Sequence, residues 1–502
     1  MNKFSCLYQK SIVTIALLFA FVLGARSQTN TSYNANTIPI GGTFSTAFGV
    51  EALKINVGTE NTANGYRALY FNTTGSENTA NGFNALYSNT TGGANTANGY
   101  QALFSNINGI GNTSIGYFSL LKNTTGSYNT ANGYRALWLN TTGYNNTAIG
   151  TNALYVSTKG NGNTALGSYT LAFNTEGSEN IAIGSQALFF NTTGYHNIAI
   201  GVEALYSNTD GNGSTAVGYQ ALYSNTTGGS NTANGNNALY TNTDGFANTA
   251  VGYSALRYNT IAFGNTAIGS GALSSNTTGL ENTAIGGANL NYNTTGSFNT
   301  SNGAESLLSN ITGNSNTSIG FRTLFTNTNG SNNVSIGDSA GYNSLGNGNI
   351  YLGKRTGFYE TGDNKLYIGN DSSRTIIYGD MSSGQLLLGN KQPFGYTFKG
   401  TRTLNVLGGI LSDSVRVSLS TNWADYVFAD DYQLKPLAEL ESFIKTNKHL
   451  PNIPSAEEVA TNGIELASMN AKLLEKIEEL TLYVIKQQKE LNELKKITQK
   501  AN

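Results

Sequence analysis

Residues 61–77 read NTANGYRALYFNTTGSE, and variants of this string fill most of the chain. The glycine of its Asn-Thr-Ala-x-Gly motif recurs at Gly65, Gly82 and Gly99 and onward to Gly337, always 17 residues apart. Seventeen copies follow one another without insertion or deletion, and a further copy at residues 45–49 precedes them at a spacing of 16. A fixed period of this kind identifies a repeat protein in which each copy is one structural unit.

A few positions hardly vary among the copies. Asparagine fills the Asn61 position in every copy but one, and Ala or Ser always fills the Ala63 position. Leucine fills the Leu69 position except at Gly341, and glycine fills the Gly75 position except at two places. We therefore expect structural ladders of equivalent side chains, represented in the first copy by Asn61, Ala63, Gly65, Leu69 and Gly75.

We interpret each copy as one coil of a β-solenoid. Its Asn, Gly and Thr disfavour a helix, and 17 residues are few for a two-helix unit. Two short strands are expected around residues 62–64 and 66–70, with Asn-Thr-Thr-Gly as the turn, because Asn and Gly tolerate a left-handed backbone. Stacking would create a thin leucine core and hydrogen-bonded asparagine ladders. At ~4.8 Å per coil, eighteen coils form a rod roughly 85 Å long.

The overall composition agrees with a repetitive β protein. Charged residues make up 11% of the 502 residues, and there are 60 glycines and five prolines. The hydrophobic share of 39% excludes a disordered chain, which needs low hydrophobicity and high net charge. A net charge of -1 gives no reason to expect nucleic acid as a partner.

The N-terminus predicts export. Lys3 and Lys10 precede an apolar run over residues 12–23, and small residues then lead to a cleavage site after Ser27. That run is too short to span a bilayer, so no membrane-spanning segment is expected after removal of the signal peptide. Cys6 is the only cysteine, so the mature chain is expected to have no disulfide and no thiolate metal site.

The C-terminal part has a different composition. The last 102 residues hold 26 of the 57 charged residues, which indicates a boundary near residue 400. Pro436 suits the start of a helix, and Ser455 with Glu458 forms a capping box. From Asn470 a heptad pattern predicts a short coiled coil, which leaves dimer and trimer open. Its apolar seam is expected at Leu473, Ile477, Leu480, Val484, Leu491 and Leu494.

The Asn-Thr-Ala-Ile-Gly motif at residues 146–150, 265–269 and 282–286 resembles the head repeat of YadA-type trimeric autotransporter adhesins. The resemblance covers about residues 45–345 and implies a left-handed parallel β-roll built by three identical chains. Two features differ from that family: its repeat is usually shorter than 17 residues, and its C-terminal outer-membrane anchor is not found here. The secretion route is therefore not implied.

The segments WADYVF (423–428), HLPNIPSAEEV (449–459) and LLEKIEELTLY (473–483) resemble C-terminal regions of bacterial tail-fibre-like surface proteins. Some of those proteins carry an autoprocessing intramolecular chaperone that cleaves itself with a Ser/Lys pair. Ser412 and Asp413 are similar to its Ser-Asp motif, but no lysine follows closely. We keep autoprocessing as an alternative.

Single residues give little sign of chemistry. His196 and His449 lie too far apart in sequence to suggest a metal pair, and His196 is expected to be exposed. Trp138 is expected to pack in an aromatic ladder and Trp423 to anchor the small C-terminal domain. No carboxylate cluster interrupts the repeats, so a polysaccharide-processing enzyme is disfavoured. Ice binding or polysaccharide binding through regular rows such as Thr62 and Thr79 is a further alternative.

We therefore expect an exported surface protein for adhesion or display, without enzymatic activity, cofactor or metal. It would be a mainly β homotrimer with an unidentified surface, glycan or protein ligand. The expected organisation is a signal peptide (1–27), a lead-in (28–44), a β-roll of 17-residue repeats (45–345), a β transition zone (346–400), a small α+β tail-fibre-like domain (401–463) and a coiled-coil helix (464–502).

Overall fold

The computed structural model describes residues 31–33, 43–391, 398, 403–417 and 423–500. The chain divides into two compact units, residues 1–408 and 409–502, each of which is described by itself. The expected signal peptide and most of the expected lead-in lie outside the described residues.

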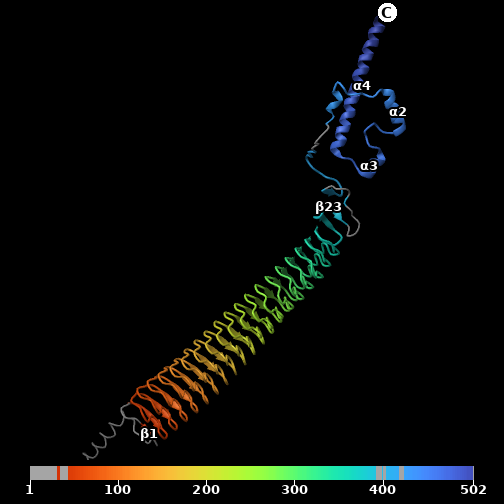
Figure 1. Ribbon diagram of the computed structural model, residues 1–502. Helices are drawn as coiled ribbons and strands as arrows, with labels where there is room; N and C mark the ends of the chain where they lie inside the picture. The colour runs from red at the N-terminus through yellow and green to blue at the C-terminus, as the bar shows by residue number, and fades with distance from the viewer. Residues whose placement is uncertain (1–30, 34–42, 392–397, 399–402, 418–422, 501–502) are drawn as a thin grey trace, which may run out of the picture. The chain divides into compact units, whose positions relative to one another are not determined.

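The first unit is a parallel β-solenoid in which each coil contributes one three-residue strand (Figure 1). Strand β3 (Thr62–Asn64) pairs in parallel with β4 (Thr79–Asn81), so that Thr62 lies opposite Thr79 and Ala63 opposite Ala80. The same register continues from coil to coil and places equivalent residues in rows along the axis. The stacked 17-residue coils confirm the predicted β-solenoid.

The other strands before the end of the stack are β1 (Thr31–Tyr33), β2 (Thr46–Phe48), β5 (Thr96–Asn98), β6 (Thr113–Ile115), β7 (Thr130–Asn132), β8 (Thr147–Ile149), β9 (Thr164–Leu166), β10 (Ile181–Ile183), β11 (Ile198–Ile200), β12 (Thr215–Val217), β13 (Thr232–Asn234), β14 (Thr249–Val251), β15 (Thr266–Ile268), β16 (Thr283–Ile285), β17 (Thr300–Asn302), β18 (Thr317–Ile319), β19 (Val334–Ile336) and β20 (Ile350–Leu352).

The expected second strand around residues 66–70 is wrong. These residues form a turn, and the backbone is left-handed at Arg67 (φ 55°) and Leu69 (φ 52°). The expected reason for Gly75 is also wrong, because this residue does not have a left-handed φ. A Cβ at Gly75 would lie 2.3 Å from the carbonyl oxygen of Gly92 in the next coil, so close packing excludes a side chain there.

The interior of the solenoid combines an apolar ladder with two polar ones. Leu69 and Ala63 are fully buried, and so are their equivalents in neighbouring coils. The predicted ladder at the Asn61 position is present: the backbone N–H of Asn78 donates to Asn61 Oδ1 at 3.0 Å. A second ladder is formed by Asn72, a residue expected in the turn: Asn89 Nδ2 donates to Asn72 Oδ1 at 2.7 Å.

The leucine core ends at a buried tyrosine. Tyr351 occupies the Ala63 position of its coil and is fully buried. Glycine replaces the core leucine both in the coil before Tyr351, at Gly341, and in the coil of Tyr351 itself, at Gly357. A Cβ would lie 2.6 Å from the Tyr351 ring at Gly341 and 2.2 Å from it at Gly357. Gly341, the one exception to leucine among the seventeen copies, therefore leaves the space that the Tyr351 ring fills.

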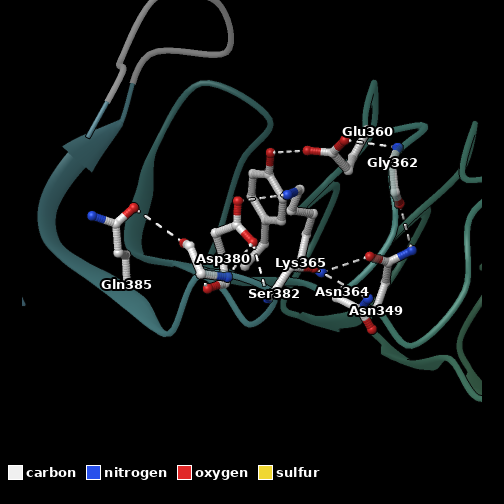
Figure 2. A network of polar contacts seen from close by, with 10 residues as sticks. Asn349, Glu360, Gly362, Asn364, Lys365, Asp380, Ser382 and Gln385 are labelled. Atoms are coloured by element: carbon white, nitrogen blue, oxygen red, sulfur yellow. Dashed lines mark hydrogen bonds and ion pairs between the residues drawn. The ribbon is translucent and has the colours of Figure 1, made fainter. Parts of the chain in front are cut away.

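Longer strands follow this tyrosine: β21 (Lys365–Gly369), β22 (Thr375–Asp380), β23 (Gln385–Lys391) and β24 (Leu404–Val406). β22 is antiparallel to both β21 and β23. Figure 2 shows the polar contacts here, where Asn349 Oδ1 accepts from the Lys365 N–H at 2.7 Å and Lys365 pairs with Asp380 at 2.8 Å. The backbone N–H of Lys365 thus satisfies the side-chain oxygen of Asn349, where the asparagine ladder ends.

The second unit consists of the 3-10 helix η2 (Ala424–Phe428) and helices α2 (Leu437–Asn447), α3 (Ala456–Asn462) and α4 (Leu466–Lys500). Pro436 directly precedes α2, and both hydrogen bonds of the predicted capping box between Ser455 and Glu458 are present. The expected small α+β domain (401–463) is divided between the two units. Its strand β24 lies in the first unit and pairs with β23, and its helices η2, α2 and α3 lie in the second.

The helix η2 packs against α4 through Ala424 and Val427, which are both buried. Trp423 stays 53% exposed, so the expectation that it anchors this unit is wrong. Polar contacts hold the unit together instead. The hydroxyl of Tyr426 donates to Glu475 Oε2 at 2.6 Å, and Asn452 Nδ2 donates to Glu475 Oε1 at 3.2 Å.

Candidate functional site

Aromatic side chains form two rows on the outside of the solenoid. The first ring row occupies the Tyr66 position in five consecutive coils, with ring centroids 4.9–5.7 Å apart. It comprises Tyr66, Phe83, Tyr100, Tyr117 and Tyr134. The second ring row occupies the Tyr70 position and is interrupted; its longest run is Phe189, Tyr206, Tyr223 and Tyr240. Trp138 belongs to this row and stacks on Tyr155 at 5.0 Å, as expected for a ladder residue.

Stacking determines which parts of the rings are available to a ligand. Tyr100 has Phe83 on one side at 5.1 Å and Tyr117 on the other at 4.9 Å, so its two faces are covered and its edge is exposed. The first ring row ends at Tyr134, because the next coil carries Thr151 at the equivalent position. A ring face can therefore take part in binding only where a row stops.

Arginines lie between the two ring rows. The guanidinium carbon of Arg67 lies 4.9 Å from the Tyr66 ring centre, and its Nε donates to Glu51 Oε2 at 2.6 Å. Hydrogen bonds from Lys54 and Arg67 lower the pKa of Glu51. Arg322 repeats the arrangement with Glu305 at 2.6 Å. The rings and these ion pairs therefore share one side of the solenoid.

Branched apolar residues form a row on the outer face of the strands, at the Asn64 position. Ile149, Leu166, Ile183 and Ile200 follow one another in successive coils and are 36–42% exposed. Ile268, Ile285, Ile319 and Ile336 continue this isoleucine row farther along the stack. In the N-terminal coils the same position carries Asn64, Asn81 and Asn98. Exposure of so many branched side chains in one line indicates a contact surface.

Helix α4 carries the predicted seam on an exposed face. Leu473, Ile477, Leu480, Val484, Leu491 and Leu494 are 46–62% exposed. The residues that the rest of the unit covers, Ala471, Glu475 and Glu478, lie at other heptad positions. Packing within the described part of this unit therefore leaves the seam about half exposed.

The remaining expected residues show no chemistry in common. His196 is exposed, as expected, and pairs with Glu179 at 2.8 Å. Ser412 lies in an exposed segment, where its hydroxyl donates to the carbonyl oxygen of Ser414 at 2.7 Å. Within the described ranges, no three His, Cys, Asp or Glu side chains are grouped so that they could hold a metal ion.

Two features of the stack were not predicted from the sequence. The Asn72 ladder was visible as an asparagine that recurs in nearly every copy, and the first ring row was visible as Tyr or Phe at the Tyr66 position in five successive copies. Both signals are periodic, but the sequence alone does not show which side chains face inward when residues 66–72 leave the strand.

No protein-family model, no curated protein and no solved structure matches this chain. Among the helices of the described residues, none is both long and apolar enough to cross a membrane.

Proposed function

We propose that this chain is an exported surface protein that assembles as a homotrimer and uses its rod of stacked coils for adhesion or display. The rod would be a left-handed β-roll of the adhesin type, and α4 would form the coiled coil that joins three copies. The ligand would be a glycan or a protein on another surface, bound by many equivalent coils whose weak contacts add up.

The exposed seam of α4 is the observation that carries this proposal. An isolated helix of 35 residues that leaves six branched apolar side chains about half exposed loses the free energy of their burial. In a coiled coil these positions pack as knobs into holes of neighbouring helices. The opposite side of the helix is already covered by η2, so the seam is the free side.

The isoleucine row supports assembly along the rod as well. Ile149, Leu166, Ile183 and Ile200 would be buried if the strand faces of neighbouring copies met. Because each is 36–42% exposed, each burial would contribute less than the ~1.5 kcal/mol or more of a fully exposed side chain. The period of the stack allows two rods to slip by whole coils, so a coiled coil at one end would align the three copies.

Light scattering on the mature chain, residues 28–502, tests the proposed assembly. We expect the mass of a trimer for the wild type and the mass of a monomer for Val484→Asp and for a chain ending before residue 465. The matched control is Ile485→Asp: Ile485 is exposed on the same helix but lies outside the seam, so this variant should remain a trimer. A folded monomeric wild type would refute the trimer, and antibody labelling of intact cells would test surface location.

Ice binding is a second candidate, favoured by the in-register threonines. Thr62, Thr79 and Thr96 lie opposite one another on paired strands, and threonine holds this position through Thr164. Such rows repeat at the strand spacing of ~4.8 Å. Thermal hysteresis of the purified rod, lost on replacing Thr96 and Thr113 by lysine, would support this function, whereas no hysteresis would exclude it.

A further inference from the structure

One stretch of the solenoid is purely basic. No aspartate or glutamate occurs between Glu77 and Glu176, whereas Lys122, Arg135 and Lys159 lie within that stretch. Lys159 is neutralised by Glu176 at 3.0 Å. Lys122 and Arg135 form no ion pair with any described residue. These six coils therefore carry uncompensated positive charge, although the whole chain has a net charge of -1.

The two cations without an ion pair stand in adjacent coils. Lys122 stands in the coil before Arg135, and its backbone N–H donates to the carbonyl oxygen of Trp138 at 3.1 Å. The guanidinium carbon of Arg135 lies 4.9 Å from the ring centre of Tyr134 and 5.6 Å from that of Trp138. We call Lys122, Tyr134, Arg135, Trp138 and Asn152 the Arg135 cluster.

Arg67 shows what Arg135 lacks. Both arginines occupy the same position in their coils, but the preceding coil offers Glu51 to Arg67 and only Phe118 to Arg135. As a result Arg135 Nε is shielded from solvent without a hydrogen-bond partner among the described residues. The same is true of Trp138 Nε1 and of Asn152 Oδ1, which belongs to a side chain that is 8% exposed.

Unpartnered atoms of the same kind occur at Arg257 Nε, at Arg355 Nε and, at the Asn152 position of other coils, in Asn84 and Asn237, so they do not mark a ligand site. The charge does: the half-buried Arg135 guanidinium and Lys122 have no carboxylate partner among the described residues, which favours an anionic acceptor. The cluster also stands where the first ring row stops, because Thr151 follows Tyr134 in the next coil, and Arg135 lies over the Tyr134 ring.

We propose that the Arg135 cluster binds a carboxylate-bearing polysaccharide, with a uronic acid as the recognised sugar. The carboxylate would accept from the Arg135 guanidinium while Lys122 adds charge, and the sugar ring would lie against the exposed edge of Tyr134. Two free cations are too few for a phosphate polymer, whose affinity grows with the number of phosphates neutralised. This inference names a ligand for the proposed adhesin and so rests on that proposed function.

Binding of polygalacturonate to the full mature chain, followed by calorimetry at low salt, tests the inference. We expect binding of polygalacturonate and none of its neutral, fully methyl-esterified form. Arg135→Gln should raise the Kd roughly tenfold or more, as expected for loss of a charge-assisted hydrogen bond. The matched control Arg67→Gln should change the Kd by less than roughly twofold, because Glu51 already neutralises Arg67.

Phe118→Glu tests the same idea without removing any residue of the cluster. It places beside Arg135 the carboxylate that Arg67 has, and polygalacturonate binding should be lost while the circular dichroism spectrum stays unchanged. Equal binding by Arg135→Gln and Arg67→Gln, or equal binding of the methyl ester, would overturn the inference. Equally tight binding of poly-L-glutamate or single-stranded DNA would overturn the choice of a sugar.

The outcome is separable from that of the proposed assembly. A trimer that does not bind polygalacturonate would overturn this inference and leave the assembly intact. A monomer that binds it would contradict the assembly and leave the Arg135 cluster in place.

Discussion

At the scale of the residue, the buried asparagines explain how a core so rich in polar groups can be stable. Asn106 Nδ2 donates to Asn89 Oδ1 at 2.8 Å and to the carbonyl oxygen of Gly109 at 2.9 Å. Its own Oδ1 accepts from Asn123 Nδ2 at 2.8 Å. Buried amides with partners of this kind avoid the penalty of unpaired polar groups, and the partners come from both neighbouring coils.

Replacing Asn106 by aspartate should therefore be severe. The carboxylate would face two acceptors, Asn89 Oδ1 and the Gly109 carbonyl, in place of the donated hydrogen bonds. We expect a loss of about 3 kcal/mol or more in the free energy of unfolding at neutral pH. Asn108→Asp is the control, since Asn108 is exposed. Equal urea midpoints for the two variants would contradict this account.

At the scale of the element, the end of the leucine core depends on paired changes of size. Tyr351 fills the space left by Gly341 and Gly357, and its hydroxyl lies 3.0 Å from Ser344 Oγ. Ser344 itself replaces the asparagine of the second ladder. Burial raises the pKa of Tyr351 well above its ordinary value. Two neighbouring coils thus change together to replace the repeated core by an aromatic one.

Gly341→Leu should destabilise this end by about 1–3 kcal/mol or more, because the new side chain would collide with the Tyr351 ring. The double variant Gly341→Leu with Tyr351→Ala restores the leucine and alanine of the repeat and should recover part of the loss. The backbone already suits leucine, since φ is 59° at Gly341 and 52° at Leu69. Melting temperatures would show the recovery, and additive losses would disprove the pairing.

Glu475 makes the packing of η2 on α4 sensitive to pH. Burial by itself would raise the pKa of Glu475, but hydrogen bonds from Lys476, Tyr426 and Asn452 outweigh it and lower the pKa below the ordinary 4.5. A lowered folded-state pKa stabilises the unit above about pH 4.5. That stabilisation is lost as the pH falls through the folded-state value.

We therefore expect the near-ultraviolet circular dichroism of the second unit to change on acidification below about pH 4.5. Glu475→Gln should lose this dependence, whereas Glu490→Gln, at an exposed position of α4, should keep it. Burial raises the pKa of Glu478, which acts in the opposite direction, so the difference between wild type and Glu475→Gln isolates the effect. Identical acid titrations of these two proteins would refute the assignment.

At the scale of the whole molecule, the stack behaves as a one-dimensional array in which each coil contacts only its neighbours. The parallel register lets any coil stack on any other, even where a residue differs from the repeat. Ser214 replaces an asparagine of the first ladder, and its hydroxyl accepts the N–H of Asn231 at 3.2 Å. Length should thus be variable in units of one coil.

Deleting residues 214–230 removes one coil and joins two coils in the correct phase, with Asn231 following the coil of Asn197. We expect a folded rod that is shorter by roughly 4.8 Å and an unchanged oligomeric mass. Deleting residues 214–222 breaks the phase and should cause aggregation or proteolysis. Small-angle scattering distinguishes the two, and tolerance of the out-of-phase deletion would contradict a stack based on register.

The repeat period was sufficient to predict a β-solenoid, its Asn61, Leu69 and Gly65 ladders and the first strand of each coil. The capping box of α3 also followed from two residues, Ser455 and Glu458. These features depend on local preference and on spacing, which a sequence displays directly. Trimeric assembly, adhesion and export stay predictions.

Other features were decided only when the coils were stacked. Arg67 and Leu69 adopt a left-handed backbone that L-amino acids avoid in isolation, so local preference favours a strand where the structure has a turn. Packing against the next coil compensates this preference and turns Asn72 inward. The same long-range contacts determine which charges are paired: Arg67 and Arg135 look alike in sequence, and only their neighbours one coil away distinguish a neutralised cation from a free one.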